Sequence, residues 1–298
     1  MRGTLGSRLE IGAVLRCGLL VCTLLLGAGL ARAADSSGLL TLVEGPAQVV
    51  DGARSLVAVP GLKLGPSTLI DTTPATNLLR VEFADGSTLD IGPDTKVMLM
   101  PPGLAGSGPK APAFYLLQGW AKHSAVRAGG ATGAGQLAPQ LELLQVAGVT
   151  VGRVTADDAM LFVESGQAQL QERKIKGTLG LKAGEFYSRS GSDKGSVAPR
   201  PSADFLKGLP RSFRDTLPPL AKQFAGKTIE PKPAPALNYA ALKPWLTAEP
   251  VIRREFPKRF GVLAKDAAFR EALVKNLSTH PEWEPVLFPP KPPSSASR

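Results

Sequence analysis

The stretch VEFADGSTLDIGPDTKVML, residues 81–99, decides how the first half of the chain is interpreted. Its carboxylates Asp85, Asp90 and Asp94 lie within ten residues of each other, as metal ligands would. A calcium site, however, needs about six to eight oxygens that converge on one point, often closed by a bidentate Glu that is missing here. Asp85-Gly86 between two alternating segments is typical of a two-residue hairpin turn, and Asp90 falls on the following strand. The stretch therefore predicts strands and turns, and no metal site.

The rest of the first half repeats this pattern. Short segments rich in β-branched and aromatic residues are separated by Asp-Gly, Ser-Gly and Gly-Pro pairs, and helix-length amphipathic patterns are nearly absent. The segments are LLTLVEG, AQVVDGARSLVAV, NLLRVEF, TKVMLM, FYLLQGWAKHSAV, LELLQVAGVTVGRVT, AMLFVESGQAQLQER and EFYSRS. They predict a mainly β fold, either an antiparallel sandwich or a rolled sheet.

Charge and pattern both change near residue 200. Residues 34–199 carry 14 Lys and Arg against 15 Asp and Glu, a net charge of −1, whereas residues 200–298 carry 17 against 9, a net charge of +8. From this point apolar residues recur at helical spacings of three and four. They are Leu206, Leu209, Phe213, Leu217, Leu220 and Phe224. Because Pro210 and Pro218-Pro219 interrupt this face, short helices that restart at each proline are predicted.

A proline-rich connector, TIEPKPAPAL, separates this segment from a second helical cluster. In that cluster, Asp266 is predicted to cap a helix that ends before Pro281. The composition of the last residues is typical of disorder. The expected organisation is a signal peptide at 1–33, a β domain at 34–199, a small basic α-helical C-terminal module at 200–290 and a disordered tail at 291–298.

The N-terminus has the pattern of an export signal. A basic region precedes the apolar run Cys17–Leu30, and Ala31–Ala33 supplies the small residues of a cleavage site. The run has 14 residues, fewer than the roughly 18–20 that a spanning helix needs. We therefore expect Sec export, cleavage near Ala33-Ala34 and a periplasmic location; the alternative is an uncleaved helix that anchors the chain in the inner membrane, facing the periplasm. Both cysteines lie in this segment, so the mature chain is expected to have none.

The run Leu62–Leu99 resembles the FecR domain in its Thr-rich turn, its aliphatic-Asp-Gly-Ser-x-Leu strand pair and its Gly-Pro turn. FYLLQGWAK, MLFVESGQAQL and LKAGEFY resemble the later hairpins of that family and its final Ala-Gly-Glu turn, so the resemblance covers roughly Leu39–Arg189. It implies a periplasmic, non-catalytic domain of the kind used in envelope sensing and trans-envelope signalling. A FecR-type sigma regulator also has a cytoplasmic segment before its membrane helix. Here only about 16 residues precede the apolar run, so we expect no direct contact with a sigma factor.

No residue set in the sequence predicts catalysis. His123 and His280 stand alone in different halves of the chain, and Asp157-Asp158 is typical of a turn between two strands. The glycine-rich segment Gly129–Gln136 lacks the Lys-Ser/Thr ending of a phosphate loop. We therefore expect no enzyme activity, no catalytic residue, no cofactor and no metal.

The stretch IRREFPKRF suggests a binding surface instead, because Arg253, Arg254, Lys258 and Arg259 stand among apolar residues with one opposing Glu. Either this is an ordinary solvated helix face, or it binds an anionic partner by electrostatic attraction. Nucleic acid is not expected as a partner outside the cytoplasm. An envelope protein or an anionic cell-wall or lipid component is expected. The sequence thus predicts a non-catalytic periplasmic binding, scaffold or envelope-sensing protein; the alternative is an inner-membrane-anchored signalling component of a FecR-type regulatory system.

Overall fold

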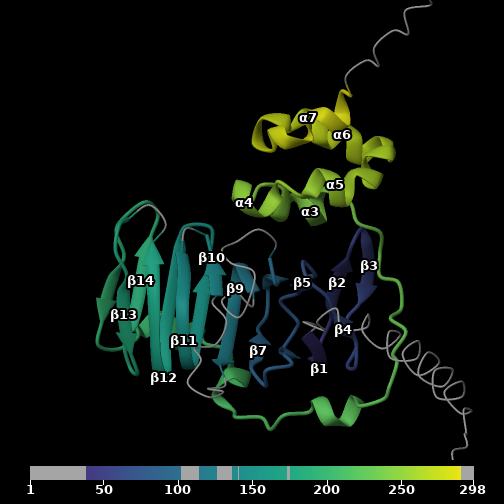
Figure 1. The fold of residues 1–298 in the computed structure, drawn as a ribbon. Coiled ribbons are helices and arrows are strands. Elements are labelled where there is room, and N and C mark those ends of the chain that lie inside the picture. Colours follow the sequence, from purple (N-terminus) through teal and green to yellow (C-terminus); the bar gives the residue numbers. More distant parts are fainter. Residues whose placement is uncertain (1–37, 102–113, 126–135, 140, 173–174, 290–298) are drawn as a thin grey trace, which may run out of the picture. The chain divides into compact units, whose positions relative to one another are not determined.

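The computed structural model describes residues 38–101, 114–125, 136–139, 141–172 and 175–289, all within the second of two compact units, Ser36–Arg298. The expected signal peptide, most of the glycine-rich segment at 129–136 and the tail at 291–298 lie outside the described residues. The described strands form one hydrogen-bonded sheet of 15 strands, nearly all antiparallel, and short helices follow them (Figure 1). The predicted mainly β class with a helical C-terminal part is confirmed.

The strands follow the chain from the N-terminus as short segments joined by turns, with three long ones in the middle. They are β1 (Gly38–Glu44), β2 (Ala47–Asp51), β3 (Arg54–Val57), β4 (Lys63–Leu64), β5 (Leu69–Thr72), β6 (Leu78–Glu82), β7 (Thr88–Ile91), β8 (Lys96–Leu99), β9 (Phe114–Ala125), β10 (Gln136–Ala138), β11 (Leu141–Val154), β12 (Asp158–Glu172), β13 (Leu179–Lys182), β14 (Phe186–Ser190) and β15 (Ser196–Ala198).

Strand β9 joins two branches of the sheet. Its first half pairs with β8, which leads to β5, β2 and β3, and its second half pairs with β7, which leads to β6, β1 and β4. The partner changes at Gly119, whose φ is +91°, and a Cβ there would lie 2.2 Å from the Thr95 hydroxyl oxygen. Only glycine fits this position. Apolar side chains from both branches, such as Leu40 and Val97, pack in one core.

The long strand β12 folds back on itself. Arg189 pairs with Ala159 near the start of β12, yet its Nε lies 3.7 Å from the Glu172 carboxylate at the end of β12. A straight strand would separate residues 159 and 172 by about 43 Å. The bend is possible at Gly148 of β11 and Gly166 of β12, which are paired with each other next to a register shift. Both glycines have positive φ, which other residues rarely adopt. The sheet is therefore rolled.

A long connecting segment, residues 203–234, runs from the last strands to β3, and we call it the strap. It contains α2 (Ala203–Gly208), η1 (Arg211–Arg214) and η2 (Ala221–Phe224). The ring of Phe205 lies 5.1 Å from Trp120 and 4.9 Å from Phe186. At its other end, Lys232 and Ala234 hydrogen-bond with the backbone of β3. The strap therefore covers the outer face of the sheet and then one of its edges.

The strap corrects one prediction. A single helical face from Leu206 to Phe224 is wrong: Phe205 is fully buried, whereas Leu206 is 46% exposed. The short helices do restart near prolines, as predicted, but extended segments between them rotate each one separately. Helical spacing therefore does not continue from one helix to the next.

The C-terminal helices form a second apolar cluster. They are α3 (Tyr239–Leu246), α4 (Pro250–Arg253), α5 (Phe256–Phe260), η3 (Gly261–Lys265), α6 (Ala267–Lys275), η4 (Leu277–Thr279), η5 (Pro281–Trp283) and α7 (Glu284–Leu287). Asp266 caps α6 as predicted, accepting a hydrogen bond of 2.8 Å from the Phe269 amide. The cluster includes sheet residues such as Leu69 and Tyr115, and Trp245 donates to Asp71 of β5 at 3.2 Å. No helix in the described part of the chain is both long enough and apolar enough to cross a membrane.

Candidate functional site

The turn after β6 is a loop of three residues, which corrects the predicted two-residue turn. The amide of Phe83 donates to the carbonyl of Ser87 at 2.9 Å, and that of Gly86 donates to Phe83 at 3.0 Å. Asp85 accepts bonds from the Ser87 amide and hydroxyl at 2.9 and 2.6 Å, and Gly86 has a φ of +83°. Asp94 occupies the next turn with a φ of +47°. Both residues therefore lie in turns, and the turn interpretation is confirmed for both.

Asp90 has a different role, in a buried ion pair. Arg80 stands directly opposite it in the β6–β7 ladder, and the two groups bond bidentately at 2.6 and 2.7 Å. Both residues are almost fully buried, and Arg80 donates a third bond of 3.0 Å to the Leu217 carbonyl in the strap. The three-residue turn sets this register, because a two-residue turn would shift every pairing by one position.

Two neighbouring charges bind the strap in the same way. The Glu82 carboxylate accepts bonds from the amides of Leu220 and Ala221 at 2.7 and 3.1 Å. The ammonium group of Lys122 donates to the Phe213 carbonyl at 2.6 Å and pairs with Glu164 at 2.9 Å. Strand β6, with Arg80 and Glu82, and strand β9, with Lys122, thus contribute buried charges that are satisfied by backbone of the strap. These groups hold the fold together and are not open to a substrate.

The two histidines lie in separate cores. His123 is 1% exposed in β9, its ring is edge-on to Phe114 at 5.5 Å, and burial lowers its pKa to about 4. His280 is buried beside the Thr279 hydroxyl at 2.8 Å, and burial, together with Arg253, lowers its pKa. Both are neutral packing residues at neutral pH. Asp157 lies in the turn between β11 and β12, as predicted, and Asp158 begins β12 with its carboxylate 3.2 Å from the Thr155 hydroxyl.

Two of the four basic residues singled out in the sequence face inward. The guanidinium of Arg259 donates to the carbonyls of Val50, Gly52 and Ser67, and stacks on the Phe260 ring at 4.6 Å. Burial lowers the pKa of Arg259 to about 10. The side chain of Arg259 therefore fixes the helices to the loops that follow β2 and precede β5.

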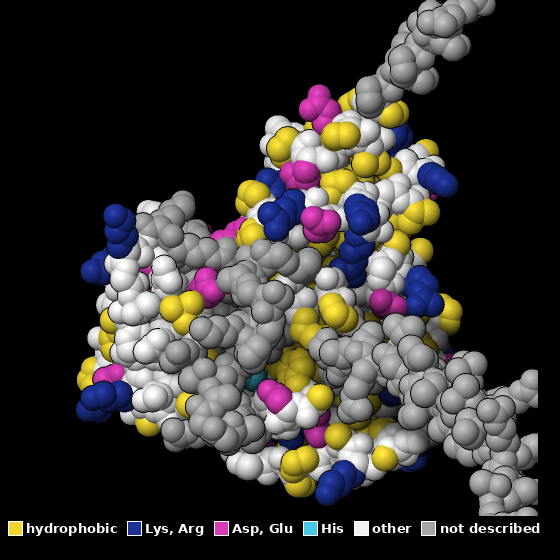
Figure 2. Space-filling view, viewed as in Figure 1, with side chains coloured by type: hydrophobic (Ala, Val, Ile, Leu, Met, Phe, Trp, Pro, Cys, Tyr) yellow, Lys and Arg dark blue, Asp and Glu magenta, His cyan; other side chains and the backbone are white. Residues whose placement is uncertain are grey.

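Arg253 also has intramolecular partners, since it donates to the Thr279 carbonyl and lies 3.3 Å from Glu282. Arg254 and Lys258 are exposed. They are four residues apart, across the junction of α4 and α5. On the face shown in Figure 2, the Lys and Arg side chains of the helices alternate with Asp and Glu. The four residues do not form a single exposed surface, and partner binding by Arg254 and Lys258 stays a prediction.

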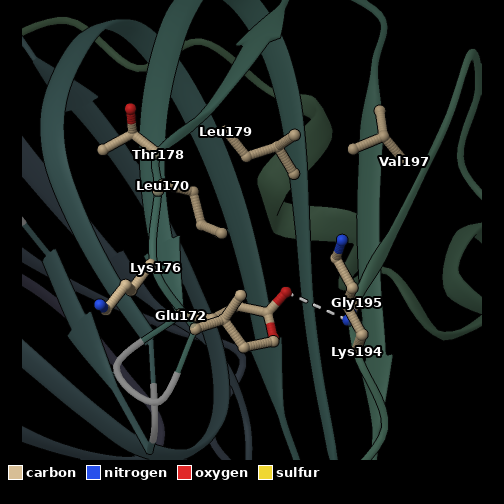
Figure 3. Close-up of a pocket in the computed structure, with 10 residues that line it drawn as sticks. Leu170, Glu172, Lys176, Thr178, Leu179, Lys194, Gly195 and Val197 are labelled. Atoms are coloured by element: carbon tan, nitrogen blue, oxygen red, sulfur yellow. Dashed lines mark hydrogen bonds between the residues drawn. The ribbon is translucent and has the colours of Figure 1, made fainter.

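A groove of about 350 Å³ opens between β13 and β15 (Figure 3). Leu170, Leu179 and Val197 form its apolar walls, and Glu172 closes one end by accepting a bond of 3.1 Å from the Gly195 amide. Lys176 and Lys194 stand at its rim. Burial and the neighbouring Glu172 carboxylate raise the pKa of Tyr187, whose ring lies in the core beneath. Sequence reasoning missed this groove, because neither strand has a recognisable binding motif.

The described residues contain no group of three or more His, Cys, Asp or Glu that could hold a metal ion. The groove itself offers one carboxylate, Glu172, which accepts a hydrogen bond from the Gly195 amide and lies 3.7 Å from the Arg189 Nε. Apolar walls and cationic side chains at the rim make up most of the rest of its lining.

No protein-family model and no curated protein matches the chain. Two crystal structures of a "putative anti-sigma factor" from Parabacteroides distasonis ATCC 8503 give partial matches, both at 12% identity. One has a TM-score of 0.38 over 47% of this chain and 64% of that chain, and the other has 0.37 over 44% and 59%. This chain thus covers less than two thirds of each. Such a likeness assigns neither a family nor an activity to this chain.

Proposed function

We propose that the chain is a non-catalytic binding protein of the cell envelope, exported by its N-terminal signal and built on a FecR-like β domain. One observation carries the proposal: the groups that chemistry would need are already used to hold the fold. Asp85 shapes a turn, Asp90 neutralises a buried arginine, and His123 is a neutral core residue. A protein whose carboxylates and histidines serve its fold in this way, and whose surface has an open groove, is suited to binding.

The ordered motifs from Leu39 to Arg189 support the FecR-like part of the proposal, together with a role in envelope sensing. The net charge of +8 after residue 199 supports an anionic envelope partner, either an acidic protein or a cell-wall or lipid component. Arg254 and Lys258 are the members of the basic stretch that remain exposed for such a partner.

Cell fractionation with N-terminal sequencing tests the proposed location. A periplasmic product that starts at Ala34, or within one or two residues of it, supports export with cleavage. Full-length chain recovered only with the inner membrane would favour the anchored signalling component instead.

Crosslinking in intact envelopes, followed by identification of the crosslinked species, tests the binding role. Capture of an acidic protein or polymer that is lost when Arg254 and Lys258 are both changed to Glu is the expected result. Turnover of an envelope substrate by the purified chain would overturn the non-catalytic role.

A further inference from the structure

Two strands of the rolled sheet have an unpaired edge where they face the groove. Among the described strands, β13 pairs with β12 alone and β15 pairs with β14 alone. The strap covers one other edge, because its backbone pairs with β3 through Val57 and Lys232. The chain therefore already satisfies one edge with an extended segment and leaves these two uncovered.

The hydrogen-bond pattern of β13 shows which of its backbone groups are free. The amide of Ala183 donates to the Gly166 carbonyl of β12. Because antiparallel neighbours bond at alternate residues, Leu181 and Leu179 also point their backbone groups toward β12, whereas Gly180 and Thr178 point theirs away. Nothing lies within 4 Å of a Cβ built on Gly180, so its surroundings are open.

The same alternation applies to β15. The amide of Val163 in β12 bonds to Glu185, so Tyr187 faces β12, and Phe186 and Ser188 face β15. Val197 is paired opposite Tyr187 and therefore points its N–H and C=O toward the groove. Both edges of the groove thus present unpaired backbone groups.

Side chains from the inner face of the sheet line the space between these edges. Leu179 pairs with Leu170 across the two strands and lies on the same face of β13 as Leu181. Leu170 and Leu181 are each 1% exposed. Leu179 and Val197 are 37% and 40% exposed, although they belong to the face that forms the core. The groove between the unpaired edges of β13 and β15 is where the rolled sheet stays open, and we call it the seam. One further strand could fit there.

The charge around the seam indicates what kind of strand fits. Lys176, Lys182 and Lys194 are exposed, and none of them forms an ion pair with another described residue. The nearby carboxylates of Glu172 and Glu185 are bonded to backbone amides of the same region. A second copy of this chain would bring the same lysines together, and like charges across a strand pair are destabilising.

We propose that the seam binds an extended acidic peptide, which adds as a strand along β13. Its backbone pairs with Gly180 and Thr178, its inward side chains contact Leu170, Leu179 and Val197, and its carboxylates lie near the lysines. Main-chain bonds with a row of alternate side-chain contacts are how sheet edges recognise peptides. This binding does not depend on the compartment in which the chain works.

The test uses the purified chain and a fluorescein-labelled peptide, Glu-Val-Glu-Leu-Glu-Val-Glu, followed by fluorescence anisotropy. Gly180→Pro removes the edge amide without touching a bond to β12, because that amide points outward. We expect it to weaken binding by about tenfold or more, and the matched control Gly180→Ala to stay within about twofold. The peptide with Lys in place of Glu should bind weakly.

A second variant keeps the test decisive if Gly180→Pro misfolds, which loss of amide protection in β12 would reveal. Lys176→Glu with Lys194→Glu changes only exposed side chains and should weaken the acidic peptide by about tenfold and strengthen the Lys peptide. Full-strength binding by Gly180→Pro, equal affinity for both peptides, or no anisotropy change at all would overturn the proposal. So would a dimer of this chain that Gly180→Pro abolishes, because a second copy would then occupy the seam.

Discussion

Replacement of Asp90 by Asn should destabilise the chain strongly, because it breaks the buried ion pair under the strap. The substitution keeps the shape of the side chain and removes its charge. Arg80 is 4% exposed and would keep only the Leu217 carbonyl and an amide oxygen as acceptors. Removing one partner of a buried pair costs about 3–5 kcal/mol, mainly because the other charge stays buried without compensation. The free energy of unfolding should fall by about that amount.

An exposed pair of the same kind provides the matched control. Arg54 and Asp51 lie 2.8 Å apart, and their side chains are 74% and 53% exposed. Asp51→Asn should therefore change the free energy of unfolding by about 0–1 kcal/mol. Urea-induced unfolding followed by far-UV circular dichroism measures both variants.

A third variant separates the missing charge from the missing contact. Arg80→Met combined with Asp90→Leu removes both charges and fills the space with apolar groups, so it should cost less than Asp90→Asn alone. The unpaired Leu217 carbonyl should account for about 1–3 kcal/mol of what remains. If Asp90→Asn proves no more harmful than Asp51→Asn, or if the double variant proves the worst of the three, the pair does not hold the strap as described.

Three further predictions concern other parts of the fold. Because burial lowers the pKa of His123 to about 4, against about 6.5 in the unfolded chain, the unfolded state binds more protons between these values. The free energy of unfolding should therefore fall by about 3 kcal/mol between pH 6.5 and pH 4, and unfolding titrations of His123→Leu should lack this contribution. Gly166→Ala should lower the free energy of unfolding by more than about 3 kcal/mol, since its Cβ would lie 1.8 Å from the Ala147 carbonyl oxygen. Gly177 also has positive φ but its Cβ would meet no atom, so Gly177→Ala should cost only about 1–2 kcal/mol; thermal unfolding measures both variants. Arg259→Lys should speed amide exchange in α3–α7 by weakening bonds to β2, and Arg254→Lys should not; equal exchange in the two variants would contradict the role given to Arg259.

The strands were predictable because their signal is local. Alternating apolar residues and Asp-Gly or Gly-Pro pairs mark most of the strands and turns within a few residues, and the structure places strands in the predicted segments; β5 and β15 were not among them. The cap at Asp266 was predictable for the same reason, since a carboxylate reaches the third amide after it.

Register was not predictable to the residue, and the ion pair depended on it. The sequence Asp85-Gly86 fits both a two-residue and a three-residue turn, and only the second places Arg80 opposite Asp90. In the structure β6 is buried continuously, so it is covered on both faces. The strap that covers it is more than 100 residues away in sequence, and no local pattern connects the two.

The basic stretch shows a second limit, because composition gives the charge of a side chain but not its partner. Lys258 and Arg259 are neighbours of equal charge, yet Lys258 is exposed, whereas Arg259 donates to three backbone carbonyls at the sheet. A helix places adjacent residues about 100° apart around its axis, so one of them faces the sheet and the other faces solvent. Which face packs is fixed by Phe256 and Phe260.

The strap and the seam follow from one requirement of a rolled sheet, that backbone edges and outward-facing charges be covered or left to a partner. The strap meets this requirement for β3 with its backbone, and for Arg80, Glu82 and Lys122 with its carbonyls and amides. The chain then leaves the sheet for the helices at Asn238, the cap of α3. Within the described residues, the strap pairs with neither β13 nor β15, so the uncovered edges there result from the path that it takes. A peptide bound in the seam would hydrogen-bond with its unpaired edge, as the strap already does with β3.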